Sequence, residues 1–347
     1  MKCGGFRVSY RADERIFDTT VPIVTLVVFL GLLALVPGVA STYWLDVLNR
    51  IGIAVIGALG LNILVGYTGQ ISIGHAAFLA VGAYSTAILE AKVGLPFYLA
   101  IPVAALVTSG FGLVFGIPSL RLKGLYLAIA TLAAHFITTY GIIHWESMTG
   151  GVLGFMVPPA TVFGLSLESD GRIFYLIYAL VVPATLVTKN LFRTKVGRAF
   201  IAIRDRDVAA GVMGVSLFRY KLLAFLISSF YAGVAGGLMA HHSRILFPDA
   251  FTLLVAIDYL AMIIIGGMGS ILGSIFGAVF MTLLPEVLKL TATSLTGVYP
   301  QAFGLIASTR DVVFGLAVIF FLTYEPQGLA RIWVRVRSYW TLWPYSY

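Results

Sequence analysis

The sequence contains little charge. Only 11% of its 347 residues are Asp, Glu, Lys or Arg, whereas 59% are hydrophobic, and the mean hydropathy is +0.97. Soluble domains usually carry about 25% charged residues, so this composition excludes an ordinary soluble domain. The apolar runs are long and lack the alternation of a membrane barrel. The sequence therefore predicts an all-α integral membrane protein.

Cysteine and the common catalytic motifs are also scarce. Cys3 is the single cysteine, so no internal disulfide can form. His135 and the pair His241-His242 lack Cys or acidic partners at ligand spacing, which favours packing histidines over a metal site. The motifs GxxxxGK(S/T), HExxH and GxSxG are absent. We expect a protein that is not an enzyme, with no metal, no cofactor bound by this chain and no ATP hydrolysis of its own.

Hydrophobic runs predict about ten transmembrane crossings, several of them short and some broken. The runs cover 21–40, 51–67, 72–89, 97–117, 125–144, 173–188, 221–240, 254–267, 271–288 and 311–324. We interpret 21–40 as a retained signal anchor, because it is longer than the apolar core of a signal peptide.

The basic residues give the expected orientation. Of the 23 Lys and Arg residues, 17 fall in four segments that alternating crossings place on one side, 1–18, 121–123, 189–221 and 325–347. Loop 145–171 has acidic residues but no Lys or Arg. The positive-inside rule then predicts cytoplasmic tails at 1–20 and 325–347, an external loop at 145–171 and a membrane domain over 21–324. The net charge is +8, but most of the basic residues lie between the predicted spans, so we do not expect nucleic acid as a partner.

One polar stretch, 66–78 (GYTGQISIGHAAF), interrupts the hydrophobic sequence. Broken backbone persists at membrane depth only where protein or a watery cavity surrounds it. Candidates for the translocation path are Asn62, Gln70, Ser72, His75 and Asp258. The alternative is that the polar groups cap helix ends and bridge helices, and that Asp258 is held in an ion pair with Arg244 or by water.

A second glycine-rich segment, with Gly266, Gly267, Gly269, Gly273 and Gly277, follows a late hydrophobic run. Two such segments suggest an internal pseudo-repeat, because paired interruptions often flank a transport pathway. Close helix packing explains the late glycines equally simply, and for that segment we favour packing.

The longest predicted cytoplasmic segment, 189–221, contains a predicted interfacial helix over 198–213. Its apolar residues offer contacts, and Gly214 is suited to end it. We expect Ala209, Ala210 and Gly214 to form a contact surface for a partner, oriented by Arg204 and Arg206. A basic segment lying on anionic lipid is the alternative.

Several blocks together resemble the LivM-type permeases of branched-chain amino-acid ABC importers. They are 60–84 (GLNILVGYTGQISIGHAAFLAVGAY), 124–133 (GLYLAIATLA), 196–225, 257–279 (IDYLAMIIIGGMGSILGSIFGAV) and 325–329 (EPQGL). The resemblance implies a subunit in a bacterial or archaeal cytoplasmic membrane. Its partners would be a sister permease, two ATPase subunits that hydrolyse ATP, and an external solute-binding protein.

The same resemblance makes the 189–221 segment the coupling loop that docks in an ATPase groove. The family's Glu-Ala-Ala-xxx-Gly pattern corresponds here to Val208, Ala209, Ala210 and Gly214, with Asp207 as the adjacent acid. Related permeases for urea or short amides are an alternative within the family. A stand-alone channel or secondary transporter is the alternative outside it, and an intramembrane enzyme is less favoured.

Overall fold

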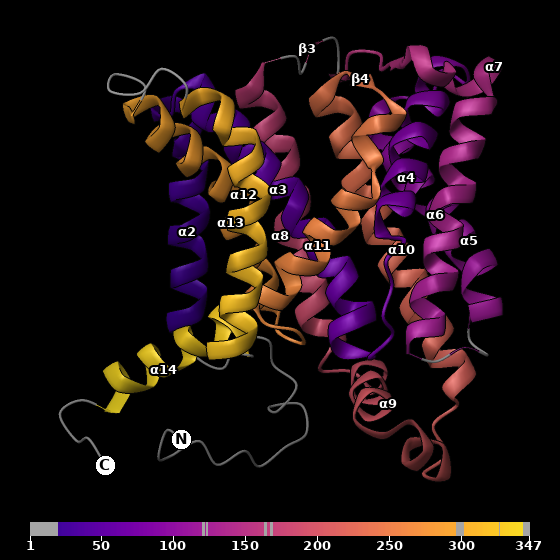
Figure 1. The fold of residues 1–347 in the computed structure, drawn as a ribbon, viewed down its shortest axis with the longest axis vertical. Helices are drawn as coiled ribbons and strands as arrows, with labels where there is room; N and C mark the ends of the chain where they lie inside the picture. The colour runs from indigo at the N-terminus through magenta and orange to yellow at the C-terminus, as the bar shows by residue number, and fades with distance from the viewer. Residues whose placement is uncertain are drawn as a thin grey trace.

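The computed structural model describes residues 20–119, 122, 124–162, 165–166, 169–295, 302–325 and 327–342. Its long helices form a bundle in which most of them run side by side (Figure 1). They are α2 (Thr20–Val39), α3 (Thr42–Asn62), α4 (His75–Ala91), α5 (Phe97–Ser119), α6 (Leu125–His144), α8 (Asp170–Leu191), α9 (Lys195–Val212), α10 (Leu217–Ser243), α11 (Leu253–Gly266), α12 (Ile271–Leu295), α13 (Ala302–Tyr324) and α14 (Gly328–Leu342).

The two ends of the bundle differ in their short elements (Figure 1). One end, here called the β4 end, carries β1 (Phe155–Met156) paired with β4 (Ile245–Leu246), β2 (Thr161–Val162) paired with β3 (Leu165–Ser166), and α7 (Glu146–Thr149), η2 (Gly151–Leu153) and η3 (Pro248–Phe251). The opposite end, here called the α9 end, carries α9 and α14.

Within the described residues, seven helices are long and apolar enough to cross a membrane, or eight if the bent pair α13 and α14 counts as one span. A helical, multi-pass membrane protein is therefore confirmed, whereas the count of about ten crossings is not. The predicted crossing 72–89 corresponds to α4, which begins at His75, has 17 residues and is not among these seven. The predicted crossing 51–67 instead extends back to Thr42.

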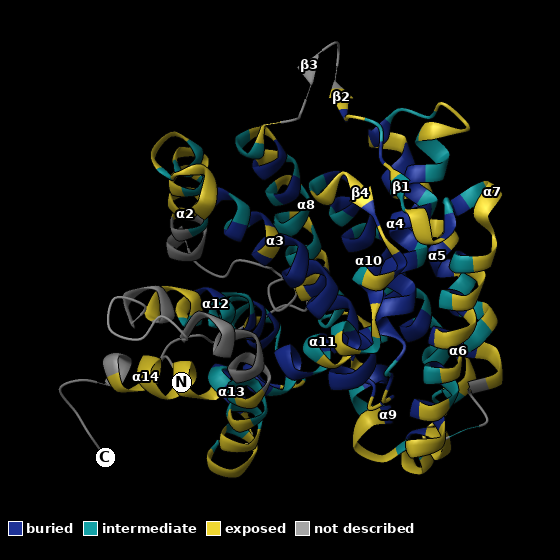
Figure 2. Cartoon of the chain, turned by 45° about the horizontal axis from the view of Figure 1, so that its top comes forward, coloured by how far each residue is buried: buried dark blue, intermediate teal, exposed yellow. Residues whose placement is uncertain are grey.

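Helix α3 forms the centre of the bundle. Together with the π-helical turn η1 (Ile63–Tyr67) it makes a span of 26 residues, and 89% of its most apolar window is buried. It packs against α8, α10, α11 and α12, and Figure 2 shows it as a largely dark blue rod. A helix that is hydrophobic on all sides belongs in such a core.

Glycines let neighbouring helices approach closely at two places. A Cβ on Gly82 of α4 would lie 2.5 Å from the Cα of Gly233 in α10. A Cβ on Gly277 of α12 would lie 1.7 Å from the carbonyl oxygen of Met262 in α11. The packing interpretation of Gly273 and Gly277 is thus confirmed. Gly269 differs, because it lies in the turn before α12.

Some predicted features lie outside the described residues. These are the N-terminal tail before Thr20, including Cys3, the basic residues Arg121 and Lys123, part of loop 145–171, and the last five residues. The internal pseudo-repeat and the cytoplasmic location of both termini stay predictions.

Candidate functional site

The first polar break is built by hydrogen bonds within the chain. After η1, residues 68–74 leave helical geometry, with Gly69 at a φ of 71°. The Thr68 hydroxyl donates to the Ile63 carbonyl at 2.7 Å, and the backbone N–H of Gln70 donates to the Leu64 carbonyl at 3.1 Å. The break is therefore an ordered turn that ends the central helix.

Asn62 joins this break to the second glycine-rich turn, which lies between α11 and α12. Its Nδ2 donates to the Ser270 carbonyl at 2.9 Å and to the Ser274 hydroxyl at 2.7 Å. Its Oδ1 accepts a bond from the Gly269 amide at 2.9 Å. All three bonds bridge helices, so the bridging alternative holds for Asn62.

Arg204 of α9 contacts both turns. Its Nη1 donates to the Gly66 carbonyl at 3.0 Å. A Cβ on Gly69 would lie 3.3 Å from the Arg204 Cγ, and a Cβ on Gly269 would lie 2.5 Å from its Nη1. We call Asn62, Gly66, Gly269 and Arg204 the glycine junction, because two glycine turns and one arginine meet there.

A pocket of about 240 Å³ opens beside the glycine junction, between the first break and α9. The Gln70 Nε2 donates to the Lys221 carbonyl at 3.3 Å, and the Lys221 ammonium lies 3.5 Å from an Asp207 oxygen. Gln70 therefore faces the helix pair α9 and α10. The pocket is lined by Thr68, Gly69, Gln70, Leu122, Gly124, Leu127, Ile203, Arg204, Asp205, Arg206, Asp207 and Lys221.

Ser72 and His75 lie deeper in the bundle than Gln70. Both side chains are buried, and neither the Ser72 hydroxyl nor either His75 ring nitrogen has a hydrogen-bond partner of ordinary geometry among the described residues. The His75 ring meets the Tyr259 ring edge-on, with centroids 5.2 Å apart, beside the Gly57 backbone.

The predicted path residues thus form two groups rather than one cluster. Gln70 belongs to the pocket beside α9, whereas His75 faces α11. Asp258 precedes Tyr259 on α11 and is half-buried. Their role in translocation stays a prediction.

Helix α9 differs from the predicted continuous helix over 198–213. Arg206 has φ −156° and ψ 98°, which are extended rather than helical angles, so the helix is kinked there. Before the kink, Phe200 and Ile203 are buried against the bundle. After it, Val212 and Met213 are each 84% exposed. The proximal part is fixed, and the distal part projects (Figure 1).

The predicted contact residues lie on this distal part. Ala209 and Gly214 are exposed, and Gly214 ends the helix at a φ of 85°. Ala210 is only 5% exposed, so it faces the chain itself. Val208, Val212 and Met213 add apolar area to the exposed side, which the sequence analysis did not anticipate for the last two.

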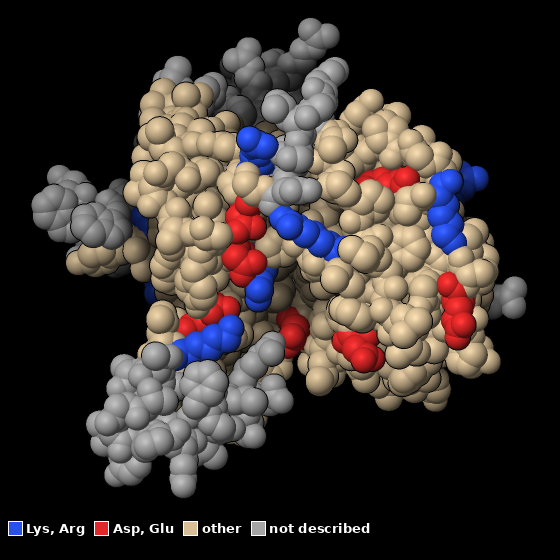
Figure 3. Space-filling model, turned by 90° about the horizontal axis from the view of Figure 1, so that it is seen from above, with Lys and Arg blue, Asp and Glu red and all other residues tan. Residues whose placement is uncertain are grey.

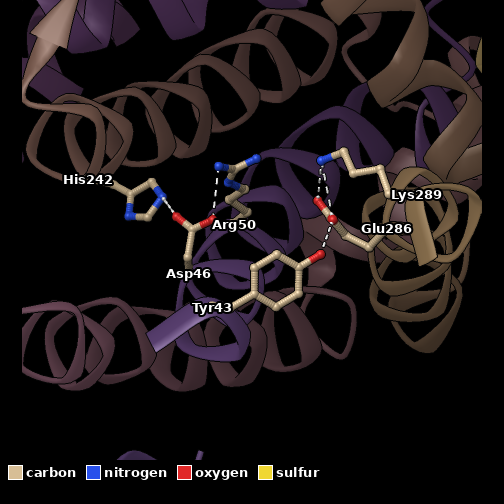
Figure 4. Close-up of polar contacts among 6 residues, drawn as sticks. All are labelled: Tyr43, Asp46, Arg50, His242, Glu286 and Lys289. Atoms are coloured by element: carbon tan, nitrogen blue, oxygen red, sulfur yellow. Dashed lines mark hydrogen bonds and ion pairs between the residues drawn. The ribbon is translucent and has the colours of Figure 1, made fainter. Parts of the chain in front are cut away.

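At the β4 end, the sequence analysis missed a charged network (Figure 4). Asp46 of α3 lies 2.9 Å from Arg50 and 3.1 Å from the His242 ring. The Tyr43 hydroxyl donates to Glu286 of α12, which also pairs with Lys289 at 3.1 Å. The network consists of Tyr43, Asp46, Arg50, His242, Glu286 and Lys289.

A second histidine pair lies close to this network. The His241 Nε2 lies 2.9 Å from Glu90 of α4, and both side chains are almost fully buried. The acidic partners of the two histidines come from far along the chain, so sequence spacing gave no signal for them. Seen from this end, acidic and basic side chains lie side by side (Figure 3).

Multi-pass helical bundles with broken, glycine-interrupted helices are common among membrane transport proteins. Residues 43–322 match the family described as branched-chain amino acid transport system / permease component. The chain belongs to this family.

Similar curated proteins include the high-affinity branched-chain amino acid transport system permease LivM of Salmonella typhimurium. It is 35% identical over 277 residues, covering 73% of this chain and 65% of that protein. The Escherichia coli LivM is 34% identical over 288 residues, covering 76% and 68%. The match thus spans about two thirds of these relatives. A probable LivH of Methanocaldococcus jannaschii is 26% identical, covering 81% and 89%.

One solved structure, PsaBC from Streptococcus pneumoniae in complex with Fab, matches with a TM-score of 0.43 and 14% identity, covering 87% of this chain and 99% of that chain. This likeness is too low to indicate a shared fold or function.

Proposed function

We propose that this chain is a membrane-spanning subunit of an ATP-driven ABC importer for branched-chain amino acids. Leucine, isoleucine or valine would be delivered by an external solute-binding protein. The complex would contain a sister permease and two ATPase subunits, which hydrolyse the ATP. It would lie in a bacterial or archaeal cytoplasmic membrane.

The main support for this proposal is the hydrogen bond that Arg204 donates to the Gly66 carbonyl. An importer driven from outside its own chain needs a rigid connection between the surface that receives the force and the helices that move. Arg204 lies on the fixed part of α9 and contacts both glycine turns. A stand-alone channel has no evident use for such a connection.

The mechanism follows from this connection. ATP binding would close the ATPase pair and displace the exposed distal part of α9. Arg204 would carry the displacement to Gly66 and Gly269, so both turns would move together as a small rigid-body shift. The α9 end would be cytoplasmic, because the basic residues of 189–221 gather there.

Co-purification tests the proposal most directly. Full-length tagged chain is purified from its own membranes, and the associated subunits and the retained solute are identified. We expect two ATPases, a second permease and a binding protein that retains branched-chain amino acids. Recovery of a urea- or amide-binding protein would contradict the proposed branched-chain amino acid substrate. Solute flux through the purified chain alone would contradict the proposed ATP-driven import.

Ala209→Trp tests the docking surface, because Ala209 is exposed on the distal part of α9. We expect lost ATPase co-purification and lost uptake, while the chain still reaches the membrane. Lys195→Trp is the matched control, since Lys195 is also exposed but begins the same helix. Equal uptake by wild type and Ala209→Trp in an intact complex would show that α9 does not dock on the ATPase.

A further inference from the structure

Helix α14 is not explained by transport or by ATPase docking. It follows α13 after a bend of 52° and leaves the bundle sideways at the α9 end (Figure 1). Helix α13 has 23 residues, or about 35 Å, which is enough to cross the hydrocarbon core. The start of α14 therefore lies near a membrane boundary.

The side chains of α14 divide into two faces. At about 100° per residue, Ile332, Trp333, Val336 and Tyr339 fall within an arc of roughly 120°. All four are exposed, although the Trp333 ring also touches the Phe276 ring of α12. Val334 lies outside this arc. An exposed apolar face that includes Trp and Tyr is typical of a helix at the membrane interface.

The other side of α14 is basic. Arg331 and Arg335 are one turn apart, and Arg337 follows at the edge of the apolar arc. Glu325 lies 3.3 Å from Arg335 and 3.8 Å from Arg331, so one carboxylate faces two arginines. Three arginines and one glutamate leave two positive charges. Three arginines also exclude a continuation of the span through hydrocarbon.

We propose that α14 lies in the membrane–water interface at the α9 end and binds the headgroups of anionic phospholipids. Arg331, Arg335 and Arg337 contact the phosphates, and Ile332, Val336 and Tyr339 enter the acyl boundary. Charge complementarity and direct continuity with a membrane span select this occupant over a second protein.

The start of α14 also touches the second glycine turn. A Cβ on Gly328 would lie 2.5 Å from the Gly267 amide nitrogen, and Ala330 is buried beside it. Arg331 and Arg204 line the same open pocket of about 770 Å³. Lipid that holds α14 in place therefore also steadies the turn that carries Gly269 to the glycine junction.

Spin labels test the position of α14 in the full-length chain, purified with its associated subunits. Cys3→Ser removes the only native thiol. Val336→Cys then places a label on the apolar face and Ser338→Cys on the basic side. Leu316→Cys, on an exposed position of α13, is the control for a span. Samples are nanodiscs of phosphatidylcholine with or without one third phosphatidylglycerol.

With anionic lipid, we expect the label at 336 to collide with oxygen and to be shielded from a water-soluble nickel reagent, and the label at 338 to do the reverse. Without anionic lipid, or with Arg331→Gln and Arg337→Gln, we expect the label at 336 to become accessible to nickel. Each lost arginine should weaken the anchoring about fivefold. The control at 316 should not change.

Three results would overturn the proposal. A label at 336 that is accessible to nickel in every lipid would place α14 in water. A label shielded from both reagents would show that protein covers this face. A depth that is the same in both lipids would remove the anionic headgroup as the ligand. None of these results depends on uptake, so they leave the proposed transport function untouched.

Discussion

The two ends of α3 are held in different ways. At the α9 end, Asn62 and Gly66 bond to backbone groups and to Arg204 across close glycine contacts. At the β4 end, Asp46 and Tyr43 bond to side chains of α10 and α12. One end is therefore fixed mainly by bonds to backbone groups, with one serine hydroxyl and one arginine, and the other by bonds between charged or polar side chains.

This difference decides how each end responds to force. Close glycine contacts at the α9 end leave little room for a side chain to adjust. At the β4 end, Arg50 and Lys289 pair within their own helices and are each 54% exposed, whereas His242 and Glu286, which bond to α3 from α10 and α12, are only 10% and 7% exposed. Exposed ion pairs contribute only about 0–1 kcal/mol each. Under the proposed mechanism, we therefore expect the α9 end to transmit motion and the outer ion pairs of the β4 end to contribute little.

Gly66→Ala should have the largest effect. The added Cβ would lie 1.8 Å from the Asn62 Oδ1 and 2.5 Å from the Gly269 amide nitrogen. Overpacking of this kind costs about 1–3 kcal/mol or more, so we expect roughly a tenfold loss of uptake and of folded protein. Detergent-solubilised yield and leucine uptake measure this. Gly110→Ala, which meets no atom within 4 Å, should behave like wild type.

Arg204→Ala should come second. It removes the bond to Gly66 but leaves the exposed surface of α9 intact. We expect the complex to assemble and hydrolyse ATP while uptake falls about fivefold, because the Arg204 side chain is 38% exposed and water replaces part of the roughly 1.5–3 kcal/mol that a hydrogen bond to a charged group contributes. Arg204→Lys should recover part of the uptake. Arg219→Ala is the control, and equal loss in both would show that only the charge matters.

Replacing Gln70 or His75 by Ala should have an intermediate effect. A path fed by a binding protein should hold its solute weakly, so we expect uptake to slow about threefold, as loss of one weak polar contact implies. The preference among leucine, isoleucine and valine should stay the same. Competition assays measure both quantities. A change of preferred solute would instead make these side chains selectivity determinants.

Asp46→Asn should have the smallest effect. It weakens the pairs with Arg50, which is 54% exposed, and with His242, which is 10% exposed, but the amide oxygen can still accept a hydrogen bond from each. We expect uptake to change less than about twofold, and high salt to reproduce the change in wild type. If Asp46→Asn reduced uptake as much as Arg204→Ala does, the two ends of α3 would not differ in their importance for transport.

The sequence predicted the helical membrane fold, because hydropathy is a local signal. It also predicted a helix within 189–221, but not the kink at Arg206. The roles assigned to Asn62, Gln70 and Arg204 stay predictions. The sequence did not predict that Arg204 reaches Gly66, since those residues are 138 positions apart. The same holds for Asp46 with His242 and for Tyr43 with Glu286. The predicted crossing 72–89 was too long because hydropathy does not register that residues 72–74 are not helical, which leaves α4 with 17 residues.

The kink at Arg206 has a consequence for how such a subunit changes over time. After it, Asp207 still pairs with Lys221 and Ala210 is buried against the chain, whereas Val208, Val212 and Met213 are exposed. Only such exposed positions can therefore change without disturbing the rest of the fold. Under the proposed docking role, exchanging them for the residues of a related permease should redirect the subunit to a different ATPase while preserving its own solute.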